Sequence, residues 1–404
     1  MALNLSEASA ALKEFYLPVI REQLSNANVL SAIIEKRKDR IEGKRAVLSL
    51  HVSRNSGVGA RAENGTLPVA GNQGYAEERV PVRYEYATIQ ISGPTIAAMK
   101  SDKGSFTRAV ESESKGAVRD VKQEVNRQRF GTSNGVIATC GVTSASTTVV
   151  LATASGANQL RQLSVGSVVD IGTVASPTSV ASARTIVSIN TSAKTMVISG
   201  AVVTTAITDF IFRSGAGGSG SSQKEITGLQ TIVAGSGTLF NVDPSTHPVW
   251  VATTNSNSGT ARSATDSLFE AVIDDIEIAS GEHPNLIVTS HGVRRAYGDG
   301  LKAQKRFSNT TELKGGFKAV TVETPSGEIA LTADRDAPSG KAFVLNTAHL
   351  NDDVMEDWSF DDQDGTVLLR VPNTDAFSGT LKAYFEQTTD QRNTHGIISD
   401  LIGG

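Results

Sequence analysis

The fold is decided by residues 46–92, which read AVLSLHV at 46–52 and RVPVRYEYATIQI at 79–91 around a glycine-rich middle. Apolar residues alternate with polar ones in both runs, and this period of two is typical of β-strands. The middle lacks that pattern and contains five spaced glycines: Gly57, Gly59, Gly65, Gly71 and Gly74. We therefore predict a two-stranded arm with a mobile, polar tip.

This arm has no further sequence of its own to fold against. An isolated two-stranded ribbon is only marginally stable in water, and loops of this length inside a domain are uncommon and usually functional. We expect the arm to lean on another molecule, which indicates a protein that works by assembly.

The composition sets the broad class. A length of 404 residues suggests two to three domains, and 39% hydrophobic with 20% charged residues is ordinary for a soluble chain. The net charge of −4 gives no basic signature of a nucleic-acid binder. The single cysteine, Cys140, excludes an intrachain disulfide and a cysteine-rich metal site. Because no membrane-length apolar run or signal peptide is recognisable, we expect use in a cytoplasm or in a particle assembled there.

Residues 1–45 are expected to form a helical N-terminal arm, since Leu12, Phe15 and Val19 recur at three- and four-residue steps. A basic cluster closes this arm: Lys36, Arg37, Lys38, Arg40, Lys44 and Arg45. Such a cluster is a solvated surface, a contact for an acidic neighbouring subunit, or a contact for packaged nucleic acid. The sequence leaves these three interpretations open.

A long helix is predicted over residues 102–130. Its narrow apolar stripe consists of Phe106, Val110, Ala117, Val121 and Val125. At about 1.5 Å per residue the helix would be about 40 Å long. Gly131 stands where helix C-termini favour glycine. The narrow stripe is typical of a helix that lies across a thin layer of protein.

The composition then changes abruptly. Residues 136–213 contain only six charged side chains and several short runs rich in Val, Ile and Thr, which predicts an inserted all-β barrel or sandwich. A flexible Gly/Ser linker, residues 214–223, follows it.

The remainder alternates between helix and strand. We predict a helix beginning at Ser263, a strand over 285–289 and a helix through Tyr297. Further strands are predicted at 318–323, 328–333, 342–346, 366–371 and 380–387. This order predicts an α+β arrangement with a mixed sheet.

An acidic run precedes the last strands, with Asp352, Asp353, Glu356, Asp357, Asp361, Asp362 and Asp364 within thirteen residues. Three interpretations stay open: a solvated loop, an intersubunit partner for basic residues, and a cation site.

The candidate enzyme motifs in the sequence do not match those of known catalytic sites. The Gly-Lys pairs at 43–44 and 340–341 are followed by Arg45 and Ala342, so neither is a phosphate-binding loop. Ser290 and His291 are adjacent at a predicted helix start and point in different directions, so Ser290 is expected to cap the helix. We expect no catalytic residue, cofactor or metal, although a hydrolase stays a third class beside the assembly functions.

In this order the pieces resemble a major capsid protein of a tailed bacteriophage with the HK97-type fold. SRNSGVGA at 53–60 and GNQGY at 71–75 are similar to the extended loops of capsid proteins from phages of actinobacteria. KEITGL at 224–229 and PVW at 248–250 are similar to the beginning of the axial domain. The β-rich segment resembles an inserted domain that some members carry.

The resemblance implies a division into parts. These are the N-terminal helical arm 1–45, extended loop 46–99, peripheral domain with spine helix 100–135, inserted β module 136–213, linker 214–223, and axial domain with returning peripheral strands 224–404. It also implies that the extended loop crosses a neighbouring subunit through Arg79, Val80, Val82, Arg83, Tyr84 and Tyr86. The loop-tip glycines would then let one chain fit hexamer and pentamer surroundings.

The implied function is structural and not enzymatic: a shell of hexamers and pentamers forming an icosahedral phage head around double-stranded DNA held by non-specific contact. The implied partners are other copies of the chain, a separate scaffolding protein, a portal and a decoration protein, with no membrane. The implied place is the virion, assembled in the cytoplasm of a bacterial host. An encapsulin-like compartment with the same fold is the alternative, and a phage tail or adhesion protein would not explain the long helix.

One departure concerns covalent chemistry. HK97 links its subunits through a lysine on the extended loop and an asparagine on a neighbour. No lysine occurs here between Lys44 and Lys100, so we predict that this crosslink is absent.

Overall fold

The protein is described here by a computed structural model. It describes residues 28–41, 43–94, 103–152, 157–303, 310–313, 317–324, 327–362 and 366–403. The helix predicted around Leu12, Phe15 and Val19 lies outside these residues. From this arm the structure describes a short helix, α3 (Val29–Ile33), and a short strand, β1 (Glu35–Arg37).

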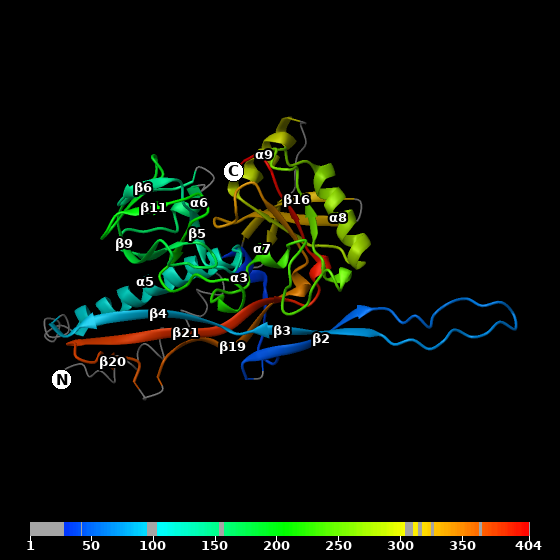
Figure 1. Ribbon diagram of the computed structural model, residues 1–404, viewed down its shortest axis with the longest axis horizontal. Helices are drawn as coiled ribbons and strands as arrows, with labels where there is room; N and C mark the ends of the chain where they lie inside the picture. Colours follow the sequence, from blue (N-terminus) through cyan, green and yellow to red (C-terminus); the bar gives the residue numbers. More distant parts are fainter. Residues whose placement is uncertain are drawn as a thin grey trace.

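A long sheet with one helix across it forms the base of the molecule (Figure 1). Its strand order is β1-β19-β21-β20, and β4 also pairs with β21. The strands are β4 (Arg83–Ser92), β19 (Leu350–Phe360), β20 (Leu369–Arg370) and β21 (Ala376–Thr389). The helix is α5 (Lys103–Arg129), within a residue of the predicted bounds at each end. Val121 and Val125 of its apolar stripe join the core beneath it, with Trp358 and Phe385.

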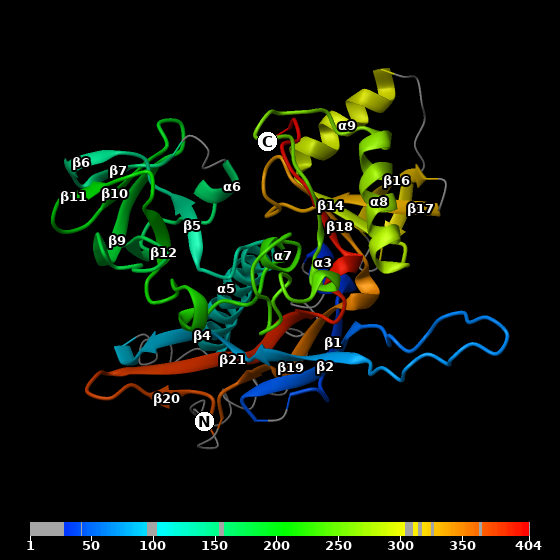
Figure 2. The same cartoon turned by 45° about the vertical axis from the view of Figure 1, so that its right-hand side comes forward.

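The extended loop is confirmed as a two-stranded ribbon, but its second strand is shorter than the alternating pattern suggested. β2 (Arg45–Ser53) pairs antiparallel with β3 (Gly74–Pro81). β4 then leaves the ribbon and pairs with β21 over ten residues. Figures 1 and 2 show the ribbon running past the rest of the molecule, so that its tip lies clear of the body.

Residues 136–213 fold into the predicted β module. Its strands are β5 (Val136–Thr139), β6 (Thr143–Ser146), β7 (Thr148–Val150), β8 (Val168–Gly172), β9 (Ala181–Asn190), β10 (Thr195–Ile198), β11 (Val203–Thr205) and β12 (Phe210–Arg213), with a short helix α6 (Ala157–Leu160). Six of the strands form one sheet, β5-β12-β8-β9-β10-β7, and β6 pairs with β11. The strands surround their own core, which includes Ile171, Met196 and Ile211.

The linker after the module is hydrogen-bonded to neighbouring segments in the structure, and its flexibility stays a prediction. The Gly215 amide donates to Asp170 Oδ2 (2.8 Å), and the Gly218 amide donates to the Asn134 carbonyl oxygen (3.2 Å). A 3-10 turn, η2 (Gly220–Ser222), ends it. The chain segments that enter and leave the module therefore lie side by side.

The last part is an α+β body around a seven-stranded mixed sheet, β13-β22-β18-β14-β17-β16-β15. The strands are β13 (Thr253–Asn255), β14 (Leu286–Thr289), β15 (Thr310–Leu313), β16 (Phe317–Thr324), β17 (Gly327–Ala333), β18 (Ala342–Leu345) and β22 (Gly396–Ile398). Helices α8 (Asp266–Ser280) and α9 (His291–Ala303) pack on one face. Helix α7 (Leu229–Ile232), with Leu30 and Phe130, packs on the other. Short 3-10 turns are η3 (Pro248–Trp250), η4 (Thr347–His349) and η5 (Arg392–Thr394).

Two local predictions need correction. The cap of α8 is Thr265, whose hydroxyl accepts from the Leu268 amide (3.3 Å), and not Ser263. The acidic run is not a loop in its first part, because Asp352, Asp353, Glu356 and Asp357 lie on β19. Residues 363–365, the end of that run, lie outside the described residues.

Candidate functional site

The distal part of the extended loop presents apolar side chains to solvent. Between the two strands, Val58, Leu67 and Val69 are 83%, 80% and 86% exposed. Exposed apolar residues that gather on one projecting segment are typical of a contact surface, whereas single ones are ordinary. The sequence predicted a polar tip because of its glycines. These three exposed apolar residues were therefore not among the predicted site residues.

The loop-tip glycines provide space for close approach. None of Gly57, Gly59, Gly65, Gly71 and Gly74 is among the positive-φ residues. A Cβ on Gly71 would lie 2.9 Å from the Ser56 amide nitrogen and 2.3 Å from Ser56 Oγ. A Cβ on Gly74 would lie 2.0 Å from Ser53 Oγ. Glycine at these two positions therefore lets the two limbs of the loop run close together.

Most of the predicted contact residues on the second strand are buried or bonded within their own subunit. This corrects the expectation that all of them contact a neighbouring subunit. Val80 and Val82 are 0% and 5% exposed. Arg83 Nε donates to Glu386 Oε2 (3.2 Å) on β21. Tyr84 and Tyr86 are exposed, and their rings meet the ring of Tyr384 edge-on. Arg79 pairs with Glu77 on the exposed face of β3. Only Arg79, Tyr84 and Tyr86 thus remain at the surface.

The base of the ribbon is anchored to the body by a small apolar cluster. Ala46 and Val80 pack with Leu239, Phe240 and Trp250. The Arg79 amide also donates to the Phe240 carbonyl oxygen (2.8 Å). The ribbon is therefore held at its base, which we call the ribbon root and which includes Ala46 and Val80. The tip of the ribbon is free of the body.

The basic cluster finds acidic partners inside the same chain. Its ion pairs are Lys36–Asp357 (3.2 Å), Lys38–Asp357 (4.0 Å), Arg37–Asp390 (2.9 Å) and Arg40–Asp390 (3.5 Å). The parallel pairing of β1 with β19 brings the two segments together and places Lys36 beside Asp352 and Arg37 beside Asp353. Lys36, Lys38, Lys44 and Arg45 are exposed, and Lys44 and Arg45 are the two of these outside the ion pairs just named.

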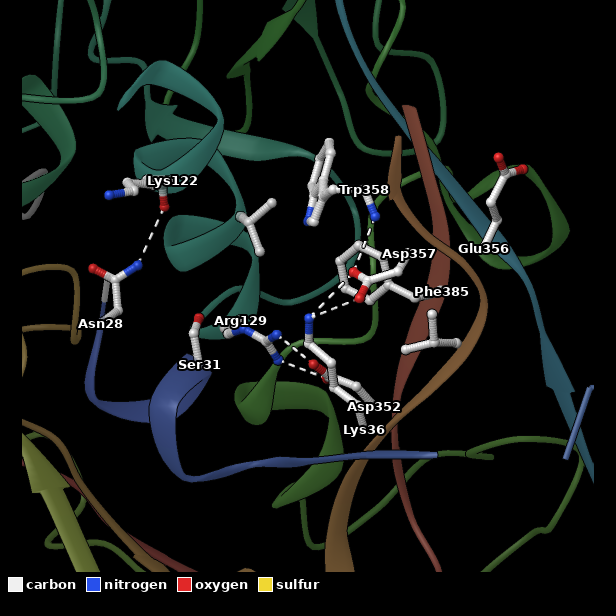
Figure 3. A pocket seen from close by; sticks show the side chains of 12 residues that line it. Asn28, Ser31, Lys36, Lys122, Arg129, Asp352, Glu356, Asp357, Trp358 and Phe385 are labelled. Atoms are coloured by element: carbon white, nitrogen blue, oxygen red, sulfur yellow. Dashed lines mark hydrogen bonds and ion pairs between the residues drawn. The ribbon is translucent and has the colours of Figure 1, made fainter. Parts of the chain in front are cut away.

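Figure 3 shows the cavity where this pairing meets the spine helix α5. Arg129 Nη1 and Nη2 donate to the two carboxylate oxygens of Asp352, at 2.8 and 2.6 Å. Lys36 reaches Asp357 at one side, while Trp358 and Phe385 form an apolar wall. Because Arg129 pairs with Asp352 and Lys36 pairs with Asp357, the cavity is a structural junction of α3, α5 and β19.

A second buried charge network joins the spine helix to the module and to the body. Arg127 on α5 binds Glu124 and Glu225, and Arg213 at the end of β12 binds Glu124 (2.7 Å). Although burial opposes it, the charges of Arg127 and Arg213 lower the pKa of Glu124 to about 2. Glu124 therefore stays ionised, whereas burial raises the pKa of Glu225. The three ion pairs tie the module to the spine helix and to the body.

The described residues give no sign of an active site. The pattern Gly-x-Ser-x-Gly occurs at 131–135, but here it follows a helix and precedes a strand, the reverse of a hydrolase elbow. The Ser133 hydroxyl is buried, bonds with Thr231 Oγ1 (3.1 Å) and accepts from the Gly228 amide (3.1 Å). Ser290 Oγ accepts from the Val293 amide, as a helix cap does. Burial raises the pKa of Cys140 to about 12, so its thiol is not activated.

The described part of the chain also lacks two other kinds of functional feature. It contains no group of three or more His, Cys, Asp or Glu side chains placed to hold a metal ion. Its helices include none that is long and apolar enough to span a membrane.

Comparison with known proteins identifies the fold. No curated protein matches the sequence. The cyanophage A-1(L) capsid asymmetric unit has a TM-score of 0.54 at 12% identity, over 94% of this chain and 93% of that chain. Its similarity shows a shared fold and confirms the predicted HK97-type architecture.

Two further solved structures are less similar, with TM-scores below 0.5. One is the holo-SrpI encapsulin complex of Synechococcus elongatus PCC 7942, with a TM-score of 0.48, 7% identity and coverage of 92% and 87%. The other is Mycobacterium phage Bobi, with a TM-score of 0.44, 10% identity and coverage of 93% and 90%.

The family assignment comes from the sequence itself. A family model described as "SU10 major capsid protein" matches residues 87–401, which is more than half of the chain. It covers the peripheral sheet from β4 onwards, the spine helix, the module and the α+β body. This chain therefore belongs to the SU10 major capsid protein family and is a structural, shell-forming protein of a phage capsid.

Proposed function

We propose that copies of this chain form hexamers and pentamers of an icosahedral phage head, joined by extended loops that each cross a neighbouring subunit. The observation that carries the proposal is the ribbon: its root is packed on its own subunit, while Val58, Leu67 and Val69 at its tip are exposed. Burying one such side chain contributes about 1.5–3 kcal/mol. Each contact is modest, but a closed shell engages many at once.

The remaining partners follow from the same role. A head encloses double-stranded DNA by non-specific contact, for which Lys44 and Arg45 are two exposed members of the basic cluster. Assembly in the host cytoplasm would use a separate scaffolding protein and a portal. A decoration protein would bind the finished shell, and the β module is the projecting surface that suits one (Figure 1).

The combined substitution Val58→Ser, Leu67→Ser and Val69→Ser tests the proposal. It should leave Tm unchanged, because the three side chains make little contact with their own subunit, and it should abolish shells in electron micrographs. The matched control is Val142→Ser, Val187→Ser and Val202→Ser, three exposed valines of the module. Normal shells from the loop variant would refute the proposed contact. Shells that hold protein cargo and no nuclease-protected DNA would favour the encapsulin-like alternative.

A further inference from the structure

A glutamate occupies the inward face of the ribbon root, where the strand pattern calls for an apolar residue. On β3, Ala76, Glu78 and Val80 point toward the body, and Tyr75, Glu77 and Arg79 point to solvent. Glu78 is 0% exposed. In the described part of the chain, neither of its carboxylate oxygens has a hydrogen-bond partner. A buried, unpartnered carboxylate is costly, and protonation relieves much of that cost.

The charged groups that face Glu78 come from three other segments. Asp353 on β19 is also fully buried, and neither of its oxygens has a hydrogen-bond partner in the described residues. Burial raises the pKa of Asp353, and Arg40 and the Thr388 hydroxyl act against that rise. Asp390 follows β21, and Arg40 follows β1. The negative charges of Asp353 and Asp390 thus act on a buried, unpartnered carboxyl at the ribbon root.

The nearby cations are already engaged by Asp390. Arg37 and Arg40 both reach its Oδ2, at 2.9 and 3.5 Å. His349 lies between Asp390 (2.9 Å) and Glu282 (2.7 Å). Because these partners converge on Asp390, Glu78 has no direct ion pair among the described residues, although Arg40 still attracts it weakly at a distance.

We propose that Glu78 is a proton-controlled latch: while it is protonated, the ribbon root stays seated on the peripheral sheet, and its ionisation beside Asp353 releases the root. The biological meaning of this release rests on the proposed role of the loop between subunits. The latch itself is a property of one subunit.

The direction of the pH dependence follows from where the proton is held. Burial, then the charges of Asp353 and Asp390, raise the pKa of Glu78 from 4.5 to about 8, with Arg40 acting weakly against them. In a released root the carboxyl is in water with its ordinary pKa. The seated state therefore binds the proton more tightly, so rising pH favours release by about tenfold per pH unit between the two pKa values. Acid conditions keep the root seated, and neutral to alkaline conditions loosen it.

Hydrogen exchange on unassembled full-length subunits tests the latch, with rates corrected for the intrinsic effect of pH. From pH 5.5 to 7.5, the opening constant of amides in β2 and β3 should rise at least tenfold, and up to about a hundredfold. Glu78→Gln should remove this rise. Glu77→Gln, the exposed carboxyl next to it, should leave the rise intact.

A second variant keeps the test decisive if Glu78→Gln folds poorly. Asp353→Asn removes a neighbouring negative charge, so Glu78 should ionise at lower pH and the rise should be smaller. A wild-type opening constant that does not change with pH, or a full rise in Glu78→Gln, would overturn the latch. Because no assembly is measured, this result is independent of whether the loop-tip variant forms shells.

Discussion

Arg129, in the last turn of the spine helix, grips both carboxylate oxygens of Asp352 on β19 while both side chains are buried. Its Nη1 also donates to Gln387 Oε1 on β21 (2.8 Å). One guanidinium therefore ties the helix to two strands of the sheet that it crosses. This contact fixes the register between the two layers of the peripheral part of the molecule.

Replacing Arg129 should be strongly destabilising. Arg129→Ala leaves Asp352 buried without a partner, and breaking a buried pair in this way costs about 3–5 kcal/mol. Urea unfolding of the subunit would measure this loss. Arg119→Ala, on an exposed turn of the same helix, should cost less than about 0.5 kcal/mol. Equal losses for the two variants would mean that the Arg129–Asp352 pair does not secure the helix.

The cap of α8 offers a comparison between two nearby hydroxyls. Thr265→Ala should lower the free energy of unfolding by about 1 kcal/mol, because the Leu268 amide loses its acceptor. Ser263→Ala, at the position expected from the sequence, should change it little. A larger loss of unfolding free energy for Ser263→Ala than for Thr265→Ala would show that Ser263 caps the helix, as expected from the sequence.

Stability should also depend on His395, which is fully buried. Burial lowers its pKa from 6.5 to about 3, so the folded protein keeps the ring neutral. An unfolded chain binds a proton on this histidine near pH 6.5, so its contribution is complete above that pH and is lost as the pH falls toward 3. The expected loss is about 1.4 kcal/mol per pH unit.

Urea titrations at several pH values, compared with His395→Asn, would isolate this contribution. The variant should show a shallower decline of unfolding free energy with acid, whereas His51→Asn, an exposed histidine on the ribbon, should follow the wild type. Parallel curves for wild type and His395→Asn would contradict the prediction.

Subunits in the particle should not be covalently linked, because residues 45–99 contain no lysine. Particles boiled in detergent should give one band near 42.4 kDa on a gel. A ladder of larger species would show that another chemistry joins them.

The sequence predicted most elements because their signals are local. The α5 stripe gave that helix within a residue at each end, and the poverty of charge in 136–213 marked the β module. What it did not show was which strands pair. Residues 79–91 were predicted as one strand, yet Pro81, which has no amide proton, marks the place where the chain leaves β2 and joins β21.

The candidate site was harder to predict because its residues depend on distant partners. The acidic run was open to interpretation as a solvated loop, since no local pattern shows that Arg129 and Lys36 will neutralise Asp352 and Asp357 on β19. Val80 was assigned to a neighbour because the sequence does not show that Trp250 and Phe240 cover the ribbon root, and Val82 is likewise buried within the subunit. The exposed Val58, Leu67 and Val69 were overlooked among glycines and asparagines.

The most direct test of the account is a cryo-electron microscopy reconstruction of the purified, assembled protein. We predict closed icosahedral shells in which density for residues 54–73 lies on a neighbouring subunit and covers Val58, Leu67 and Val69. Shells in which that density folds back onto its own subunit, or particles that stay monomeric at high concentration, would contradict the account.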